Sequence, residues 1–172
     1  MAVDAAAPDG KLNTVTTEPR NAQVARSAHR HALASGFLKW QDSSARGSDA
    51  ARVESVQAAK DSTVALLSYR PGSVDKDLAA ARDRLIGNFR DSYTSLTNDV
   101  IIPGAKQKHI SAVATVPAAA AIAADANRSV VLVFVDSTIT VGNDPPTGTE
   151  PAVRVSLEKI GGRWLITEFE PV

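Results

Sequence analysis

The residues that could carry chemistry in this chain are few, and their spacing groups them poorly. His29 and His31 are two residues apart, which on a helix points them away from each other, and His109 lies far along the chain. No Gly-x-Ser-x-Gly or His-Glu-x-x-His motif accompanies them. Cysteine is absent, so thiol nucleophiles, disulfides and cysteine-based zinc sites are excluded. We therefore expect no catalytic residues, no metal site and no cofactor.

One carboxylate requires a closer comparison of two interpretations. Asp136 follows Val130, Leu132 and Phe134 at two-residue steps, so on a strand it shares a face with an apolar row. If that face is buried, desolvation would raise the pKa of Asp136 and make it a candidate general base. If the end of the strand emerges into water, Asp136 is an ordinary surface residue. We favour the second interpretation because threonines continue the same face. For Tyr69 and Tyr93 we likewise expect core or rim positions rather than acid catalysis.

Charge and aromatic content argue against nucleic acid as a partner. The chain has 172 residues, with 19 basic and 19 acidic side chains, so no net field favours a polyanion. Aromatic residues make up 5% of the chain and the basic residues are scattered, so neither a base-stacking platform nor a phosphate-tracking stripe is present. The pair Gly161-Gly162 does not form a phosphate loop, because it separates two predicted strands rather than a strand and a helix.

The elements that would position these residues begin with helices. An apolar stripe at three- and four-residue steps predicts a helix from about residue 48, which ends before Pro71-Gly72. A second helix is predicted from Ser73 or Asp75, with a break or bend at Gly87. Helical spacing continues beyond the break until Pro103-Gly104. The apolar stripe of the first helix is Val53, Val56, Ala59, Thr63, Leu66 and Leu67, and the expected buried face of the second is Leu78, Ala81, Leu85 and Phe89. Beyond the break, Tyr93, Leu96 and Val100 continue the helical spacing.

The second half of the chain predicts strands. Residues 109–124 and 129–141 form a long hairpin, because the second run is β-branched and residues 125–128 are turn-forming. Pro117 indicates a bulge or an edge position in the first strand. Residues 142–150 are expected to form a loop. Residues 153–160 and 164–169 form a last hairpin around Gly161-Gly162, with Trp164 as a core anchor. The sequence thus predicts an α+β domain in which N-terminal helices pack on a curved four-stranded antiparallel sheet.

Residues 1–47 differ from this pattern and predict a flexible arm in front of a domain at 48–172. The arm contains small, polar and proline-broken stretches, with one short apolar run at residues 32–38. Arg26, His29 and Arg30 precede that run and Lys39-Trp40 follow it, as at the two ends of a membrane helix. Seven helical residues rise only about 10 Å, which is too short for a hydrocarbon core of about 30 Å.

Segments along most of the chain together resemble the soluble domain of the actinobacterial Mce-associated membrane proteins, whose fold is similar to the nuclear transport factor 2-like cone. The resemblance covers about residue 36 to the end. It is carried by the order and spacing of Phe37–Gln41, Ala58–Lys60, Ala65–Tyr69, Asp77–Arg82, Leu85–Phe89 with Tyr93, Val131–Val135, Gly162–Ile166 and Pro171-Val172.

The resemblance implies a non-enzymatic accessory subunit of the Mce lipid-import machinery in the mycobacterial cell envelope. The expected partners are transporter subunits, with lipid as an alternative ligand, and the family supplies no catalytic residues to carry over. The family's spanning helix is missing here although both flanks are present, which implies a shortened chain whose parent alone is anchored in the cytoplasmic membrane. The domain would then lie on the extracytoplasmic side.

Two other functions share this fold, and the interior of the domain distinguishes them. A lipid carrier needs a continuous apolar cavity, and an isomerase or cyclase needs a deep cavity with Asp136 inside it. An interior filled by side chains favours the accessory subunit.

Overall fold

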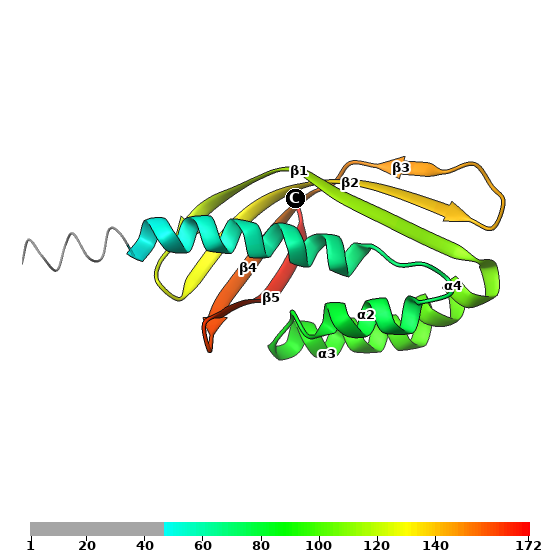
Figure 1. The fold of residues 1–172 in the computed structure, drawn as a ribbon, viewed down its shortest axis with the longest axis horizontal. Helices are drawn as coiled ribbons and strands as arrows, with labels where there is room; N and C mark the ends of the chain where they lie inside the picture. Colours follow the sequence, from blue (N-terminus) through cyan, green and yellow to red (C-terminus); the bar gives the residue numbers. More distant parts are fainter. Residues whose placement is uncertain (1–46) are drawn as a thin grey trace, which may run out of the picture. The chain divides into compact units, whose positions relative to one another are not determined.

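The computed structural model describes residues 47–172. The expected arm, its apolar run at 32–38, His29 and His31 lie outside the described residues. The described part starts with a long helix, residues 47–67, followed by the short helices α2 (Val74–Arg82), α3 (Gly87–Leu96), a π-helical turn η1 (Thr97–Ile101) and α4 (Ile102–Lys108). Strands β1 (Ile110–Ala124), β2 (Arg128–Val141), β3 (Thr147–Thr149), β4 (Ala152–Ile160) and β5 (Arg163–Pro171) complete it (Figure 1).

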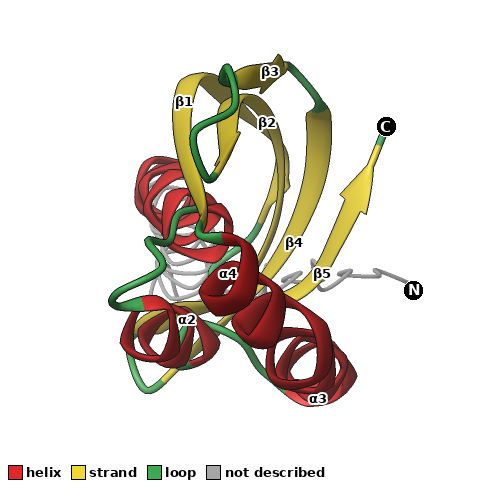
Figure 2. Ribbon diagram, turned by 90° about the vertical axis from the view of Figure 1, so that its right-hand side faces the viewer, coloured by secondary structure: helices red, strands yellow, loops and turns green. Residues whose placement is uncertain are grey.

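The strands form one antiparallel sheet in the order β1-β2-β4-β5, and the described helices lie on one side of it (Figure 2). The expected α+β architecture is therefore confirmed. The sheet has five strands rather than the expected four. The additional strand, β3, lies inside the segment 142–150 that was expected to be a loop, and it pairs with β2 near the end of that strand. The three residues of β3, Thr147 to Thr149, are too short a run for a strand to be predicted from the sequence. The strand forms because the neighbouring β2 provides the backbone groups with which it pairs.

The long helix buries a narrower and more polar face than its apolar pattern predicted. Val53 is 73% exposed, so its expected burial is wrong, whereas Ala59, Thr63 and Leu66 are buried as expected. Most of the buried face consists of small residues that allow the helix to lie close to the sheet: Ala51, Ser55, Ala59, Ser62 and Thr63. One larger side chain, Leu66, joins them. Ser55 satisfies its hydroxyl by donating to the Ser129 hydroxyl on β2 at 2.8 Å.

The expected break at Gly87 is wider than one residue. Gly87 has φ of 61°, a left-handed conformation that suits glycine, and α2 already ends at Arg82. Leu85 is fully buried, but in an extended segment beside β5 rather than on the face of a helix. The Ile86 amide donates to the Ile166 carbonyl at 3.0 Å, and the Ile166 amide donates to Arg84 at 2.9 Å. The sheet thus supplies hydrogen bonds that the interrupted helix would have made.

The helical half ends later than its proline suggested. Pro103 lies near the start of α4, directly after the π-helical turn, and α4 ends at Lys108 with His109 as its cap in the left-handed conformation (φ 51°). Leu96 and Val100 keep the expected helical conformation, but they are 51% and 59% exposed. The π-helical turn η1 begins at Thr97 and changes the helical phase, so the residues around it no longer keep the earlier face.

The core lies between the helices and the inner face of the sheet. Alternate residues of β2 and β4 are almost fully buried, and Trp164 and Ile166 add to them from β5. Side chains from the long helix and α2 fill the other side. The largest fully buried apolar side chains are Val74, Leu78, Leu85, Val131, Val133, Val155, Leu157 and Ile166.

Candidate interaction surface

Asp136 lies on the outer face of the sheet, away from the helices. Val131, Val133 and Val135 face the core, so the alternate residues of β2 face outward, and Asp136 is exposed. The expectation that this part of the strand emerges into water agrees with the structure. Val130, Leu132 and Phe134, which share the face of Asp136, are themselves partly exposed. This apolar row therefore belongs to the outer surface of the sheet and not to the wall of a cavity.

The remaining candidate residues do not converge on one site. His109 is the C-terminal cap of α4 and is exposed. Tyr93 is buried and donates its hydroxyl hydrogen to the Leu66 carbonyl at 3.2 Å, and Tyr69 is half-buried, both as expected for core or rim positions. Burial raises the pKa of the Tyr93 phenol, with a smaller contribution from Tyr69. Among residues 47–172, no group of three or more acidic or histidine side chains could hold a metal ion.

Trp164 is buried in the last hairpin, as expected, and it joins that hairpin to the long helix. Its indole Nε1 donates to the Glu54 carboxylate at 3.2 Å. The Lys159 Nζ pairs with the same carboxylate at 2.6 Å and lies 5.5 Å from the centre of the indole ring. These hydrogen bonds, first from Lys159 and then from Trp164, hold the pKa of Glu54 below its usual range. All three groups are occupied by one another, so the cluster is structural.

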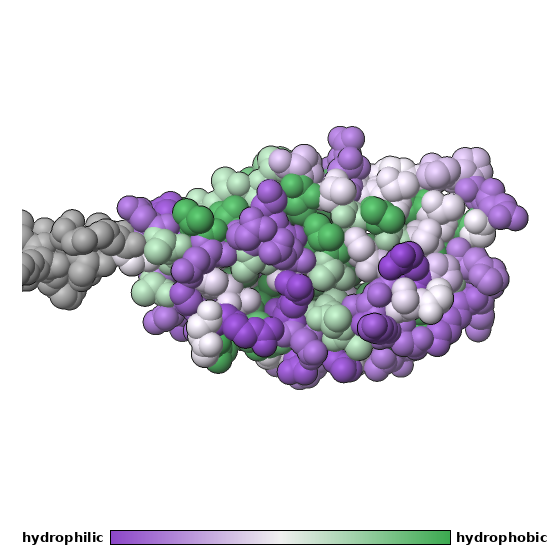
Figure 3. Space-filling view, viewed as in Figure 1, coloured by the Kyte–Doolittle hydropathy of each residue, from purple (hydrophilic) through white to green (hydrophobic). Residues whose placement is uncertain are grey.

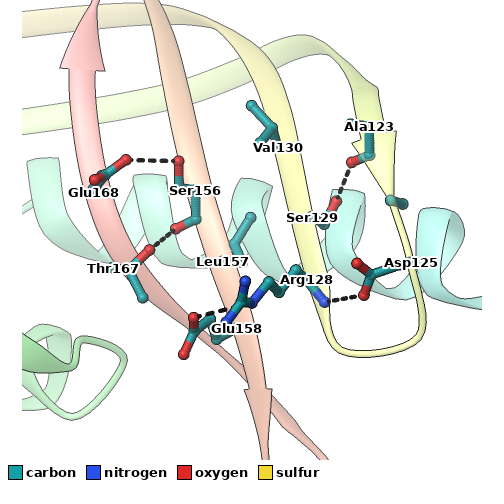
Figure 4. Close-up of a pocket in the computed structure, with 11 residues that line it drawn as sticks. Ala123, Asp125, Arg128, Ser129, Val130, Ser156, Leu157, Glu158, Thr167 and Glu168 are labelled. Atoms are coloured by element: carbon teal, nitrogen blue, oxygen red, sulfur yellow. Dashed lines mark hydrogen bonds and ion pairs between the residues drawn. The ribbon is translucent and has the colours of Figure 1, made fainter.

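An open hollow of about 470 Å³ lies on the outer face, between the β1-β2 turn and β5. Figure 4 shows its polar side chains paired with one another, with the helix behind the strands. Arg128 pairs with Glu158 at 3.4 Å, Ser156 donates to Glu168 at 3.0 Å, and Thr167 donates to the Ser156 carbonyl. Among the described residues, the Ser156 hydroxyl has a carboxylate partner and no histidine partner, an arrangement that does not activate a serine as a nucleophile.

The other side of the outer face carries exposed apolar side chains. Phe134 is 48% exposed, and it pairs with Ala118 of β1, while Leu132 pairs with Ala120. Ile122, at a bulge in β1, is 60% exposed. We call the residues Val130, Leu132 and Phe134 the outer apolar row. On the opposite face, seen in Figure 3, apolar residues are interspersed with polar ones.

The outer apolar row adjoins an edge of the sheet. β1 is at the end of the strand order, and only its first part is covered: Ala112 exchanges two backbone hydrogen bonds with Tyr69, and the Ala114 amide donates to the Ser68 hydroxyl. From Thr115 to Ala124, no described strand or bridge residue pairs with β1 along the edge that points away from β2. We call this segment the free edge. Pro117 and the register shift beside it confirm the expected bulge and edge position.

Neither the outer apolar row nor the free edge was recognised as a surface from the sequence. The alternation in β2 was visible, but alternation alone does not say which of two apolar faces meets the helices. The signal for the edge was the absence of charged residues from Ile110 to Ala124 together with Pro117.

A family model described as "Uncharacterized protein Rv1363c/MT1408-like" matches residues 20–172 of this chain. The chain belongs to this family. Outer membrane protein Rv1973 of Mycobacterium tuberculosis H37Rv is 61% identical over 137 residues, which cover 80% of this chain and 86% of that protein. Uncharacterized protein Rv1362c of the same strain is 44% identical over 126 residues, covering 73% of this chain and 57% of that protein. Both of these relatives of the Rv1363c/MT1408-like chain are mycobacterial proteins.

Solved structures with little sequence similarity share the fold. An IcmL-like type IV secretion system protein from Legionella pneumophila superposes with a TM-score of 0.58 at 8% identity, covering 68% of this chain and 88% of that chain. The periplasmic domain of DotI gives 0.57 at 13% identity, with 68% and 91% covered. CagV, a VirB8 homolog from Helicobacter pylori, gives 0.55 at 12% identity, with 68% and 95% covered. These chains support the nuclear transport factor 2-like fold for the Rv1363c/MT1408-like family.

The membrane anchor expected from the resemblance is not visible in the described part of the chain. No helix among residues 47–172 has the length and apolar character needed to cross a bilayer. The apolar run at 32–38 lies outside these residues.

Proposed function

We propose that this protein is a non-enzymatic accessory subunit of a cell-envelope assembly, and that the assembly is an Mce-type lipid importer. The observation that carries the proposal is the interior of the domain. Its core is occupied by packed side chains between the helices and the inner face of the sheet, and the Asp136 carboxylate lies outside, in water. The interior therefore favours a scaffold over an isomerase or a lipid carrier.

The surface chemistry supports partnering with protein. The outer apolar row and Ile122 expose apolar side chains on a face that the described helices leave uncovered. Exposed apolar groups of this kind are typical of protein contact sites. The relative named as an outer membrane protein supports a place in the envelope, and the neighbours that belong to secretion systems or are periplasmic support an assembly there. The Mce assignment rests on the resemblance of the sequence segments.

We further propose that the parent protein is anchored in the cytoplasmic membrane with its N-terminus inside. Arg20, Arg26 and Arg30 precede the apolar run, and basic residues beside a span stay in the cytoplasm. Fusion of a reporter enzyme to the C-terminus of the parent protein tests the orientation. A reporter that is active only in the cytoplasm would contradict it.

Crosslinking in native mycobacterial membranes, followed by capture of the tagged full-length protein and mass spectrometry, tests the proposed partner. Mce transporter subunits should be enriched when the full-length protein carries no substitution. Phe134→Asp, which puts a charge into the outer apolar row, should reduce their recovery. Ile160→Asp is the matched control, since Ile160 is similarly exposed (52%) but lies at the other hairpin. Capture without any Mce subunit would refute the Mce assignment, and equal recovery with both variants would refute the role of the row.

A separate measurement tests the absence of lipid carriage. Fluorescent fatty acid and sterol probes titrated against the chain should show no saturable binding with a defined stoichiometry. Saturable, one-to-one binding would overturn the accessory role in favour of a carrier.

A further inference from the structure

The two edges of the sheet are built differently. β5 is covered near Ile166 by Arg84 and Ile86, and its remaining residues include Glu168, Glu170 and Pro171. Charged residues and proline on an edge strand prevent pairing with other strands. The free edge of β1 has no charged residue among its ten positions, and its backbone is irregular at two places, beside Pro117 and at Ile122. Only one edge is therefore protected.

The side chains of the free edge leave its backbone accessible. Six of its ten residues are alanines: Ala118, Ala119, Ala120, Ala121, Ala123 and Ala124. Alanine neither shields the outward amide and carbonyl groups nor obstructs a strand that approaches them. Apart from the Ala123 carbonyl, which accepts from the Ser129 hydroxyl at 3.1 Å, the groups that point away from β2 have no hydrogen-bond partner among the residues that the structure describes, unlike those of Ala112 and Ala114.

We propose that the free edge pairs with the free edge of a second copy of this chain, in antiparallel orientation about a two-fold axis near Ala120. In a continuous sheet, a residue whose side chain lies on the outer face pairs with another residue of the same face. An axis at Ala120 meets this condition, because it places Ala120 opposite its own copy and Ala119 opposite Ala121 of the second copy. The closest cross-strand contacts are then between alanines, which fit the short separation of a strand pair.

Charge identifies the second copy as the occupant. A two-fold axis places a side chain at its centre opposite its own duplicate, so a charged residue there would face a like charge. The free edge contains none, and the whole chain has 19 basic and 19 acidic residues, which leaves no long-range repulsion between copies. The exposed side chain of Ile122 belongs to the free edge, and that of Phe134 lies beside it on β2. Pairing would bring both close to those of the second copy, which buries more apolar surface.

Sedimentation and light scattering of the complete 172-residue chain test the proposal. The chain should form a dimer that dissociates on dilution. Ala120→Lys should weaken the dimer by at least about tenfold, because it places like charges opposite each other. Thr138→Lys is the matched control: Thr138 is exposed on the same outer face but on β2, one strand away from the edge. It should leave the dimer intact.

Two further measurements separate edge pairing from misfolding and from other interfaces. A mixture of Ala120→Lys and Ala120→Glu should recover a heterodimer, since opposite charges then meet across the axis. Hydrogen exchange at Ala119 and Ala121 should slow when the dimer forms. A monomeric chain, a dimer insensitive to Ala120→Lys, or a dimer without protection at these amides would overturn the proposal. These experiments use the isolated chain, so their failure leaves the Mce test unaffected.

Discussion

Glu54 and Trp164, which are 110 positions apart in the sequence, meet at 3.2 Å where the long helix crosses the last hairpin. Lys159 pairs with the same carboxylate and also faces Trp164 across the β4-β5 ladder. The three residues therefore connect the beginning of the described fold to its end. A long-range contact of this kind closes a large loop, so its loss should affect the whole domain rather than one element.

Trp164→Ala should destabilise the domain by about 3–5 kcal/mol, because it removes a large buried side chain and leaves a cavity. Trp164 is only 8% exposed and lies in the main core. Chemical denaturation followed by circular dichroism measures the change. Val53→Ala is the control, since Val53 is 73% exposed, and it should change the stability by less than about 0.5 kcal/mol. A variant at Trp164 with the parent's stability would contradict the observed burial.

Glu54→Gln should flatten the dependence of stability on acid pH. The folded-state pKa of Glu54 is lowered by Lys159 and Trp164, so the ionised carboxylate is favoured in the folded protein. The stabilisation is present above the ordinary pKa of 4.5 and is lost as the pH falls through the lower folded value. Urea midpoints measured between neutral and acid pH test this. If the variant and the parent lose stability in parallel, the ion pair does not contribute.

Tyr93→Phe should flatten the alkaline side of the same profile. Burial raises the folded-state pKa of Tyr93 above its ordinary value of 10.0, so the folded phenol stays neutral while the unfolded phenol ionises. Stability should be constant below that value and fall as the pH rises above it. At neutral pH the variant loses the hydrogen bond to Leu66, which costs about 1 kcal/mol. Absorbance of tyrosinate during alkaline titration checks the assignment, and ionisation of Tyr93 near its ordinary pKa would refute it.

Gly161→Ala should destabilise the last hairpin by about 1–2 kcal/mol. Gly161 and Gly162 have φ of 58° and 79°, in the left-handed region that costs other residues about that much. Gly148→Ala is the matched control: Gly148 lies in β3 without a left-handed φ, and an added Cβ would meet nothing within 4 Å. Denaturant titration of both variants gives the comparison, and equal stability would show that the turn tolerates alanine.

The sequence alone determined the features that depend on neighbouring residues. The glycine pair predicted the last hairpin, because glycine readily adopts the positive φ that tight two-residue turns require, and both glycines have it here. Gly87 predicted a break between helices, and Pro117 a bulge at an edge, because both act on the local backbone. Trp164 was expected in the core from its place beside the turn. The class of fold followed from the order of helical and strand periodicities.

The tertiary structure decided which of two equivalent faces is buried and which strand is left unpaired. In β2 both sets of alternating residues are apolar, so only the position of the helices makes Val131 and Val133 the core and Phe134 the surface. In the long helix, burial of Ser55 rather than Val53 follows from its contact with Ser129, a residue on a distant strand. Contacts between segments far apart in the chain, such as that of Glu54 with Trp164, have no local signal, since their free energy comes from the packing of the complete domain.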